Sequence, residues 1–177
     1  MTNRPIRRIA SAAMAAAACL ASAITAPLAA SPSQASAERL LAAHNRERER
    51  VGVPRLAWSE RLAAQAQDWA DQLARTNRFQ HASDRAGAGE NLWRGTAGRY
   101  SAEAMIGSFL DEGRHFRAGA FPNVSRTGRW RNVGHYSQVI WRGTQEVGCA
   151  TARSGGGEDI LVCRYYPAGN VLGYQVL

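Results

Sequence analysis

The stretch VGCATARSGGGEDILVCRYY, residues 147–166, decides the fold. Its two ends are rich in β-branched, aromatic and small apolar residues, and a run of three glycines separates them. This order predicts antiparallel strands over 147–152 and 160–166, joined by a turn. A hairpin centred on the middle glycine places Cys149 opposite Cys163, close enough for a disulfide in an oxidising compartment, with two free thiols as the alternative.

Three helices are predicted before this hairpin. Residues 35–50 carry apolar residues at helical spacing, which predicts the first helix. Ser59 is a suitable N-cap for a second helix that ends near Asn77, and Ser101 can cap a third helix. Helices followed by an antiparallel sheet predict a layered α+β domain, and a chain of 177 residues has room for one such domain.

The segments between these elements are read from their composition. Residues 134–142 alternate and contain Tyr, Val, Ile and Trp, which predicts a third strand with Tyr136 and Trp141 on opposite faces. Residues 79–98 and 114–131 are rich in Gly and in polar or charged residues, which predicts loops with at most a short helical turn.

Residues 1–30 have the pattern of a secretory signal peptide. A basic start is followed by an Ala-rich apolar run, and cleavage is plausible after Ala30 or after Ala37. We therefore expect a single domain over residues 38–177, in a protein that is secreted or periplasmic, monomeric and, after signal cleavage, without a membrane span. An uncleaved anchor is the alternative.

The charge of the chain is a poor match to a nucleic-acid-binding protein. The 177 residues carry a formal charge of +8, and every basic residue is Arg. These arginines are scattered among acidic residues and no basic run exceeds two, so no phosphate-binding face is predicted and we expect no nucleic-acid partner.

Two imidazoles and two carboxylates form the main candidate site. His81 and Glu90 lie in the polar segment before the third helix, Glu112 is expected at the end of that helix, and His135 begins the predicted third strand. Neutral imidazoles bind Zn²⁺ and carboxylates orient them, so convergence of these four side chains would suit a divalent cation or acid–base chemistry.

Other readings of the same residues stay open at this point. Ser137 would share a strand face with His135, which with Glu90 or Glu112 suggests a serine hydrolase, although the Gly-x-Ser-x-Gly motif is missing. The two glutamates could also form a glycosidase pair. His115 lies three residues after Glu112, as a surface pair would.

Four short motifs resemble one protein family. They are HNRER at 44–48, GENL at 89–92, GHYSQVIWRGT at 134–144 and ILVCRYYPAGNV at 160–171. In this order they are similar to the motifs of the CAP superfamily, which is named for cysteine-rich secretory proteins, antigen 5 and pathogenesis-related proteins. The chain resembles a small, single-domain, bacterial-type member.

The resemblance implies a three-layer α-β-α sandwich with a central antiparallel sheet. It implies that His81, His135, Glu90 and Glu112 converge in a cleft, where the two histidines bind a divalent cation such as zinc in some members. It also implies that His44 and Asn45, in the first motif, are structural.

The function implied by the resemblance is binding rather than catalysis. Family resemblance allows a small hydrophobic ligand, such as a sterol or a fatty acid, or a cell-surface component. The alternative is an extracytoplasmic metal- or Ser-dependent hydrolase of peptides or glycans, with Glu90 and Ser137 as its catalytic candidates.

Overall fold

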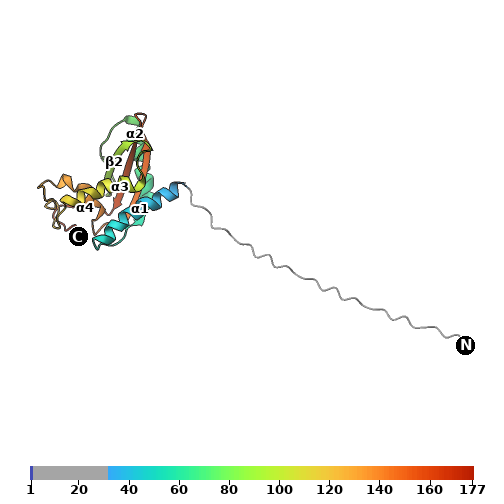
Figure 1. Cartoon of the computed structure of the whole chain (residues 1–177), viewed down its shortest axis with the longest axis horizontal. Helices are drawn as coiled ribbons and strands as arrows, with labels where there is room; N and C mark the ends of the chain where they lie inside the picture. Colours follow the sequence, from blue (N-terminus) through green and yellow to red (C-terminus); the bar gives the residue numbers. More distant parts are fainter. Residues whose placement is uncertain (2–31) are drawn as a thin grey trace.

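The computed structural model describes residue 1 and residues 32–177 (Figure 1). The predicted signal peptide, beyond Met1, lies outside these described residues. The elements follow in the order α1 (Pro32–Arg50), β1 (Ala57–Trp58), α2 (Glu60–Thr76), β2 (Gly89–Thr96), α3 (Ala102–Leu110), the 3₁₀ turns η1 (Asp111–His115) and η2 (Trp130–Asn132), α4 (Gly134–Val139), β3 (Glu146–Arg153) and β4 (Glu158–Tyr166).

The predicted hairpin is confirmed as β3 and β4, at the centre of a sheet in the order β1-β3-β4-β2. Both neighbours of β4 run antiparallel to it, and the two-residue β1 adds a short parallel pair on the far side of β3. Cys149 pairs with Cys163 in register, and the two form a disulfide. The hairpin geometry therefore predicted this bond correctly.

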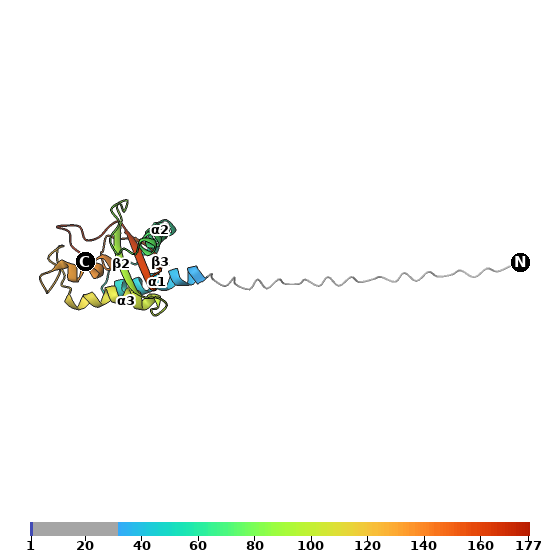
Figure 2. The ribbon, with the colours of Figure 1, turned by 90° about the horizontal axis from the view of Figure 1, so that it is seen from above.

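Helices cover both faces of the sheet, which confirms an α+β sandwich. Figure 2 shows α2 on one side of the strands and α1 with α3 on the other. Successive side chains of a strand point to opposite faces. Thus Cys163 and Tyr165 join the core under α1 and α3, whereas Ile160 and Val162 pack against the apolar side of α2.

The start of α2 lies directly on the middle of the sheet. Gly148 of β3 permits this approach, because a Cβ there would lie 2.6 Å from the backbone carbon of Leu62. Ser59 is the N-cap residue of α2, as predicted, but its side chain makes no capping bond. Ser101 does cap α3, since its hydroxyl accepts from the Ala104 backbone N–H at 3.3 Å.

Two sequence assignments were wrong. Residues 134–142 are not a strand: Gly134–Val139 form α4, and both Tyr136 and Trp141 are buried instead of facing opposite ways. Within the predicted loop 79–98, β2 pairs along its length with β4. In both cases tertiary contacts outweigh the local preference: a segment with strand composition is a helix, and a segment with loop composition is a strand because it pairs with β4.

The other elements follow the expectations more closely. Between α3 and α4 the helical elements are the 3₁₀ turns η1 and η2. Glu112 lies in η1, two residues beyond the helix that was expected to contain it. Among the helices of the described residues, none is long and apolar enough to cross a membrane.

Candidate functional site

His81 is held by a buried carboxylate. It lies in the segment between α2 and β2, and its Nδ1 is 2.6 Å from Oε1 of Glu90, which also accepts from the Ala82 backbone N–H at 3.1 Å. The Glu90 side chain is fully buried, while that of His81 is 53% exposed. Because a carboxylate accepts, Nδ1 carries the proton, and in the neutral ring Nε2 is the nitrogen that keeps its lone pair.

His135 is held in the same manner by Glu112. Its Nδ1 lies 2.7 Å from Oε1, and Oε2 accepts from the backbone N–H groups of His135 and Tyr136 at 2.9 and 3.1 Å. Glu112 thus closes the first turn of α4, whose N–H groups have no partner within the helix. The His135 ring stacks on Phe109 and its side chain is 36% exposed, and among the described residues its Nε2 has no hydrogen-bond partner.

Consecutive residues of β2 connect the two pairs. Glu90 holds the His81 ring, and the next residue, Asn91, donates from Nδ2 to the His135 backbone carbonyl at 3.1 Å. The same Nδ2 lies 3.2 Å from the Tyr165 hydroxyl. The segments that carry the two histidines are therefore both tied to the same end of the edge strand β2.

The quartet is two histidine–carboxylate pairs, not a closed cage of four ligands. Among the residues that the structure describes, the group of three ligand atoms within 4.8 Å of one another is His44, Cys149 and Cys163. Both sulfurs there are joined in the disulfide, and both nitrogens of His44 have hydrogen-bond partners. That cluster in its oxidised form has no free thiolate to offer a metal.

The predicted structural residues of the first motif are buried and fully bonded. His44 donates from Nδ1 to the Leu40 carbonyl, and its Nε2 accepts from the Tyr165 hydroxyl, both at 2.8 Å. Burial lowers the pKa of His44 to about 4, so the ring is neutral. Asn45 forms two hydrogen bonds with the backbone of Leu56, at 3.0 and 2.7 Å, and so fixes the approach to β1.

Sequence reasoning missed the residues that support the quartet. Asn91 and Tyr165 continue the hydrogen-bond chain from His44 to the His135 backbone. Arg48 is fully buried and donates to four backbone carbonyls, of which that of Val139 ends α4 and that of Trp141 follows two residues later. All three residues lie inside the quoted motifs, so the motifs contained the signal even though spacing alone did not reveal it.

Ser137 does not have the surroundings of a nucleophile. It lies in α4 and is fully buried, and its hydroxyl donates to Oδ1 of Asn170 at 2.6 Å and to the Gly134 carbonyl at 3.2 Å. The shared strand face with His135 was a consequence of the wrong strand assignment. His115 likewise forms no pair with Glu112 and instead accepts from Arg114 at its Nε2. The hydrolase alternative therefore receives no support.

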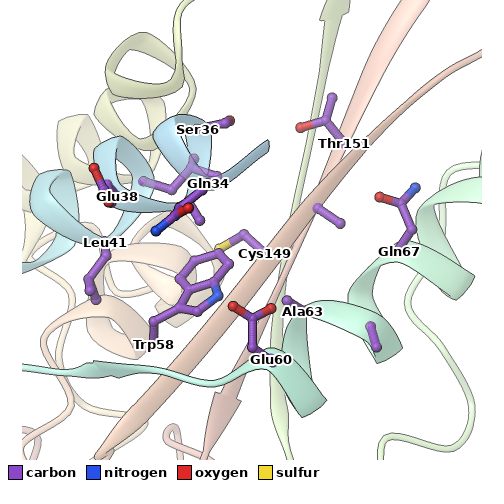
Figure 3. Close-up of a pocket in the computed structure, with 14 residues that line it drawn as sticks. Gln34, Ser36, Glu38, Leu41, Trp58, Glu60, Ala63, Gln67, Cys149 and Thr151 are labelled. Atoms are coloured by element: carbon purple, nitrogen blue, oxygen red, sulfur yellow. The ribbon is translucent and has the colours of Figure 1, made fainter. Parts of the chain in front are cut away.

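A separate hollow of about 790 Å³ lies at the other edge of the sheet (Figure 3). The start of α1, the first half of α2 and residues 149–151 of β3 surround it, with the Trp58 indole and Cys149 among its walls. Leu40, Leu41 and several alanines make its surface largely apolar. Its charged lining residues are Glu38 and Glu60, both acidic.

Comparison with known proteins gives a consistent family assignment. Residues 41–165 match the cysteine-rich secretory protein family, CAP. The chain is 35% identical over 143 residues to pathogenesis-related protein 1B of Nicotiana tabacum, covering 81% of this chain and 82% of that one. It is also 35% identical over 153 residues to pathogenesis-related protein 1 of Arabidopsis thaliana, covering 86% and 88%.

Solved structures show the same fold. A crystal structure of NaASP2 with Zn²⁺ superposes with a TM-score of 0.66 at 22% identity, covering 80% of this chain and 84% of that one. The structure of BmVAL-1 superposes with a TM-score of 0.65 at 25% identity, covering 86% and 84%. From the matched family profile, the plant relatives and this fold, the chain belongs to the CAP family.

Proposed function

We propose that this CAP protein acts outside the cytoplasm by binding, and that His81 and His135 hold a divalent cation through their Nε2 atoms. The observation that carries the proposal is the matched pair of Nδ1–carboxylate contacts, 2.6 Å to Glu90 and 2.7 Å to Glu112. Each contact sets the tautomer of a neutral ring whose side chain is partly exposed to solvent, with Nε2 as the nitrogen left to bind a cation.

The donor set fits Zn²⁺ better than Ca²⁺ or Mg²⁺. Neutral imidazole nitrogens are typical zinc ligands, whereas the two hard cations prefer a shell of oxygens. The solved relative NaASP2 was crystallised with Zn²⁺, which agrees with this choice. Two protein nitrogens would leave coordination positions for water or an external ligand, and the cation would supply a Lewis acid there.

The cation proposal is tested by calorimetry with zinc chloride on the metal-free protein. The native chain should bind one Zn²⁺, and the His81→Ala/His135→Ala double variant should lose that binding. His115→Ala is the matched control, because the His115 side chain is hydrogen-bonded to Arg114 and lies outside the quartet. Equal binding by the native chain and the double variant would contradict the proposal, and so would loss of binding in the control.

The hollow between α1 and α2 is the place we assign to a small hydrophobic ligand. Its acidic residues, Glu38 and Glu60, would repel a fatty-acid carboxylate, whereas a sterol presents only a neutral hydroxyl. The expected ligand is therefore sterol-like. Cholesterol should bind to this site more tightly than palmitate. The Glu38→Gln/Glu60→Gln variant should narrow the difference between the two affinities. A native preference for palmitate would overturn this choice.

The position of signal cleavage decides whether this hollow is complete. Gln34, Ser36 and Ala37 form part of its wall. Cleavage after Ala37 would remove them, so the ligand proposal requires cleavage after Ala30. Mass determination of the exported protein distinguishes the two products, and size-exclusion chromatography of the same sample tests the proposed monomer.

A further inference from the structure

A second, smaller pocket of about 320 Å³ lies on the α2 side of the sheet. Four side chains of α2, the segment 82–86 and Arg164 of β4 line it. Its floor is buried, since Arg164 is 4% exposed and Ala82 is 7% exposed, while its rim is polar and open to solvent. It does not share walls with the hollow beside Trp58.

Two polar atoms at this pocket have no hydrogen-bond partner. Across the part of the chain that the structure describes, Nε of Arg164 and Oε1 of Gln65 are buried and unpaired. The only charged contact of Arg164 there is from Nη2 to Oε2 of Glu90, at 3.2 Å. Buried polar groups are nearly always paired, so two unpaired atoms on residues that line one pocket point to a bound molecule that supplies both partners once the two side chains turn toward it.

The charges around the pocket favour a neutral molecule. Glu90 already opposes Arg164, and the rim carries Asp68 and Asp84 together with Arg85. An anion would therefore meet more carboxylates than free guanidinium groups, and a cation would meet the buried Arg164. A hydroxyl group avoids both penalties, because it can accept from Nε–H of Arg164 and donate to Oε1 of Gln65.

Trp69 supplies an apolar wall beside these polar atoms. Its indole is partly buried and is fixed by a hydrogen bond from Nε1 to the Gln80 carbonyl, at 3.2 Å. A flat aromatic face suits the C–H face of a sugar ring, and orienting polar groups around an apolar wall are the usual composition of a small-ligand site. The volume lies at the small end of the range for such sites, which matches one ring rather than a long chain.

We infer that this pocket binds a neutral saccharide unit, with Arg164 and Gln65 contacting its hydroxyl groups and Trp69 packing against its ring. The site is distinct from the proposed cation site, although Glu90 contacts both Arg164 and His81. If the oxygen and nitrogen of the Gln65 amide exchange positions, a donor replaces the acceptor at the pocket. A sugar hydroxyl can pair with either one, because it both donates and accepts. The inference does not depend on zinc.

The test is saturation-transfer NMR on protein kept metal-free with EDTA. The probes are glucose, galactose, mannose, N-acetylglucosamine and cellobiose, with glucuronate as the charged analogue of glucose. At least one neutral sugar should receive saturation through its ring C–H protons, and glucuronate should bind more weakly than glucose. If only water satisfies the orphaned atoms, no neutral sugar will receive saturation, and the inference is overturned.

Three variants locate any binding. Gln65→Leu should weaken it about tenfold, because a hydroxyl of the sugar would lose its partner. Gln67→Leu is the matched control: it lies two residues further along α2, lines the other hollow and should leave binding unchanged. Arg164→Lys keeps a cation opposite Glu90 but removes the Nε donor, so it should weaken sugar binding without unfolding the protein. Equal affinity in all three variants would place the sugar elsewhere and refute the assignment.

Discussion

Glu112 holds His135 at two places at once, through the ring Nδ1 at 2.7 Å and through the backbone N–H at 2.9 Å. One carboxylate therefore sets both the orientation of the imidazole and the start of the helix that carries it. This contact makes Glu112 a positioning residue for the proposed cation site and a structural cap for α4.

Replacing Glu112 by Gln should therefore weaken cation binding as well as the fold. The amide retains one acceptor oxygen for a set of three donors, and loss of such a partner costs about 10–100-fold in metal affinity. Calorimetry with Zn²⁺ measures that loss. Glu103→Gln is the control from the neighbouring helix, since Glu103 forms an exposed ion pair with Arg39 and its replacement should leave zinc affinity unchanged. Unaltered affinity in Glu112→Gln would show that the contact does not orient a ligand.

The disulfide should contribute a measurable share of stability. It joins residues 14 apart in sequence, and closing a loop of this size stabilises by about 3 kcal/mol in the chain-entropy description. Urea denaturation with and without reductant should show this difference for the native chain. The Cys149→Ser/Cys163→Ser variant should be less stable and insensitive to reductant. A native chain with the same midpoint under both conditions would contradict the expectation.

Arg48 should be among the most sensitive positions of the chain. It is fully buried, and Arg48→Met would leave the carbonyls of Pro54, Val139, Trp141 and Thr144 without their donor. Buried unsatisfied groups cost about 1–3 kcal/mol each, so a loss of at least about 3 kcal/mol is expected from denaturation curves. Exposed Arg46, in the same helix, is the control, and Arg46→Met should change stability by less than about 0.5 kcal/mol.

His44 should make stability depend on pH in the mildly acidic range. Burial lowers its pKa to about 4 from an ordinary value of 6.5, so the unfolded chain binds the proton more readily than the folded chain. Stability is then complete above pH 6.5 and is lost as the pH falls toward 4, by about 3 kcal/mol in all.

Denaturation midpoints between pH 7 and pH 4 measure this loss. In His44→Gln the starting stability should be lower, because the bonds to Leu40 and Tyr165 are disturbed, and the slope over this range should be smaller. An identical slope in the variant and the native chain would assign the pH dependence to other groups.

The sequence predicted those parts of the fold that depend on local pattern. The β3–β4 hairpin has strand residues on both sides of a glycine turn, and α2 has one continuous apolar stripe. Both follow from the chain near them. The disulfide was predictable for the same reason, since the hairpin register alone places Cys149 opposite Cys163.

The two wrong assignments depend on distant residues. β2 contains Gly, Glu and Asn, which are poor strand formers, and it is a strand because it pairs with β4. α4 has the composition of a strand, but Glu112 caps its first turn and Arg48 binds the carbonyls at its end. Neither partner is near α4 in sequence, so no local pattern could reveal it.

The candidate site was only partly predictable for a similar reason. Glu90 and His135 lie inside the quoted motifs, whereas His81 and Glu112 lie in the segments before them, and the structure pairs each histidine with one of the two glutamates. Asn91, which joins the two pairs through the His135 backbone, is one residue from Glu90 and was overlooked. Arg164 was overlooked because its interest comes from an unpaired buried nitrogen, which only the packed structure reveals.

The most direct test of the central claim is long-range ¹H–¹⁵N NMR of the histidine rings during addition of zinc chloride. The account predicts that His81 and His135 begin with the proton on Nδ1 and that their Nε2 signals move together to saturation at one equivalent. His44 and His115 should stay unchanged. Zinc-dependent shifts confined to His115, or no shift of the Nε2 signals of His81 and His135 at saturating zinc, would contradict it.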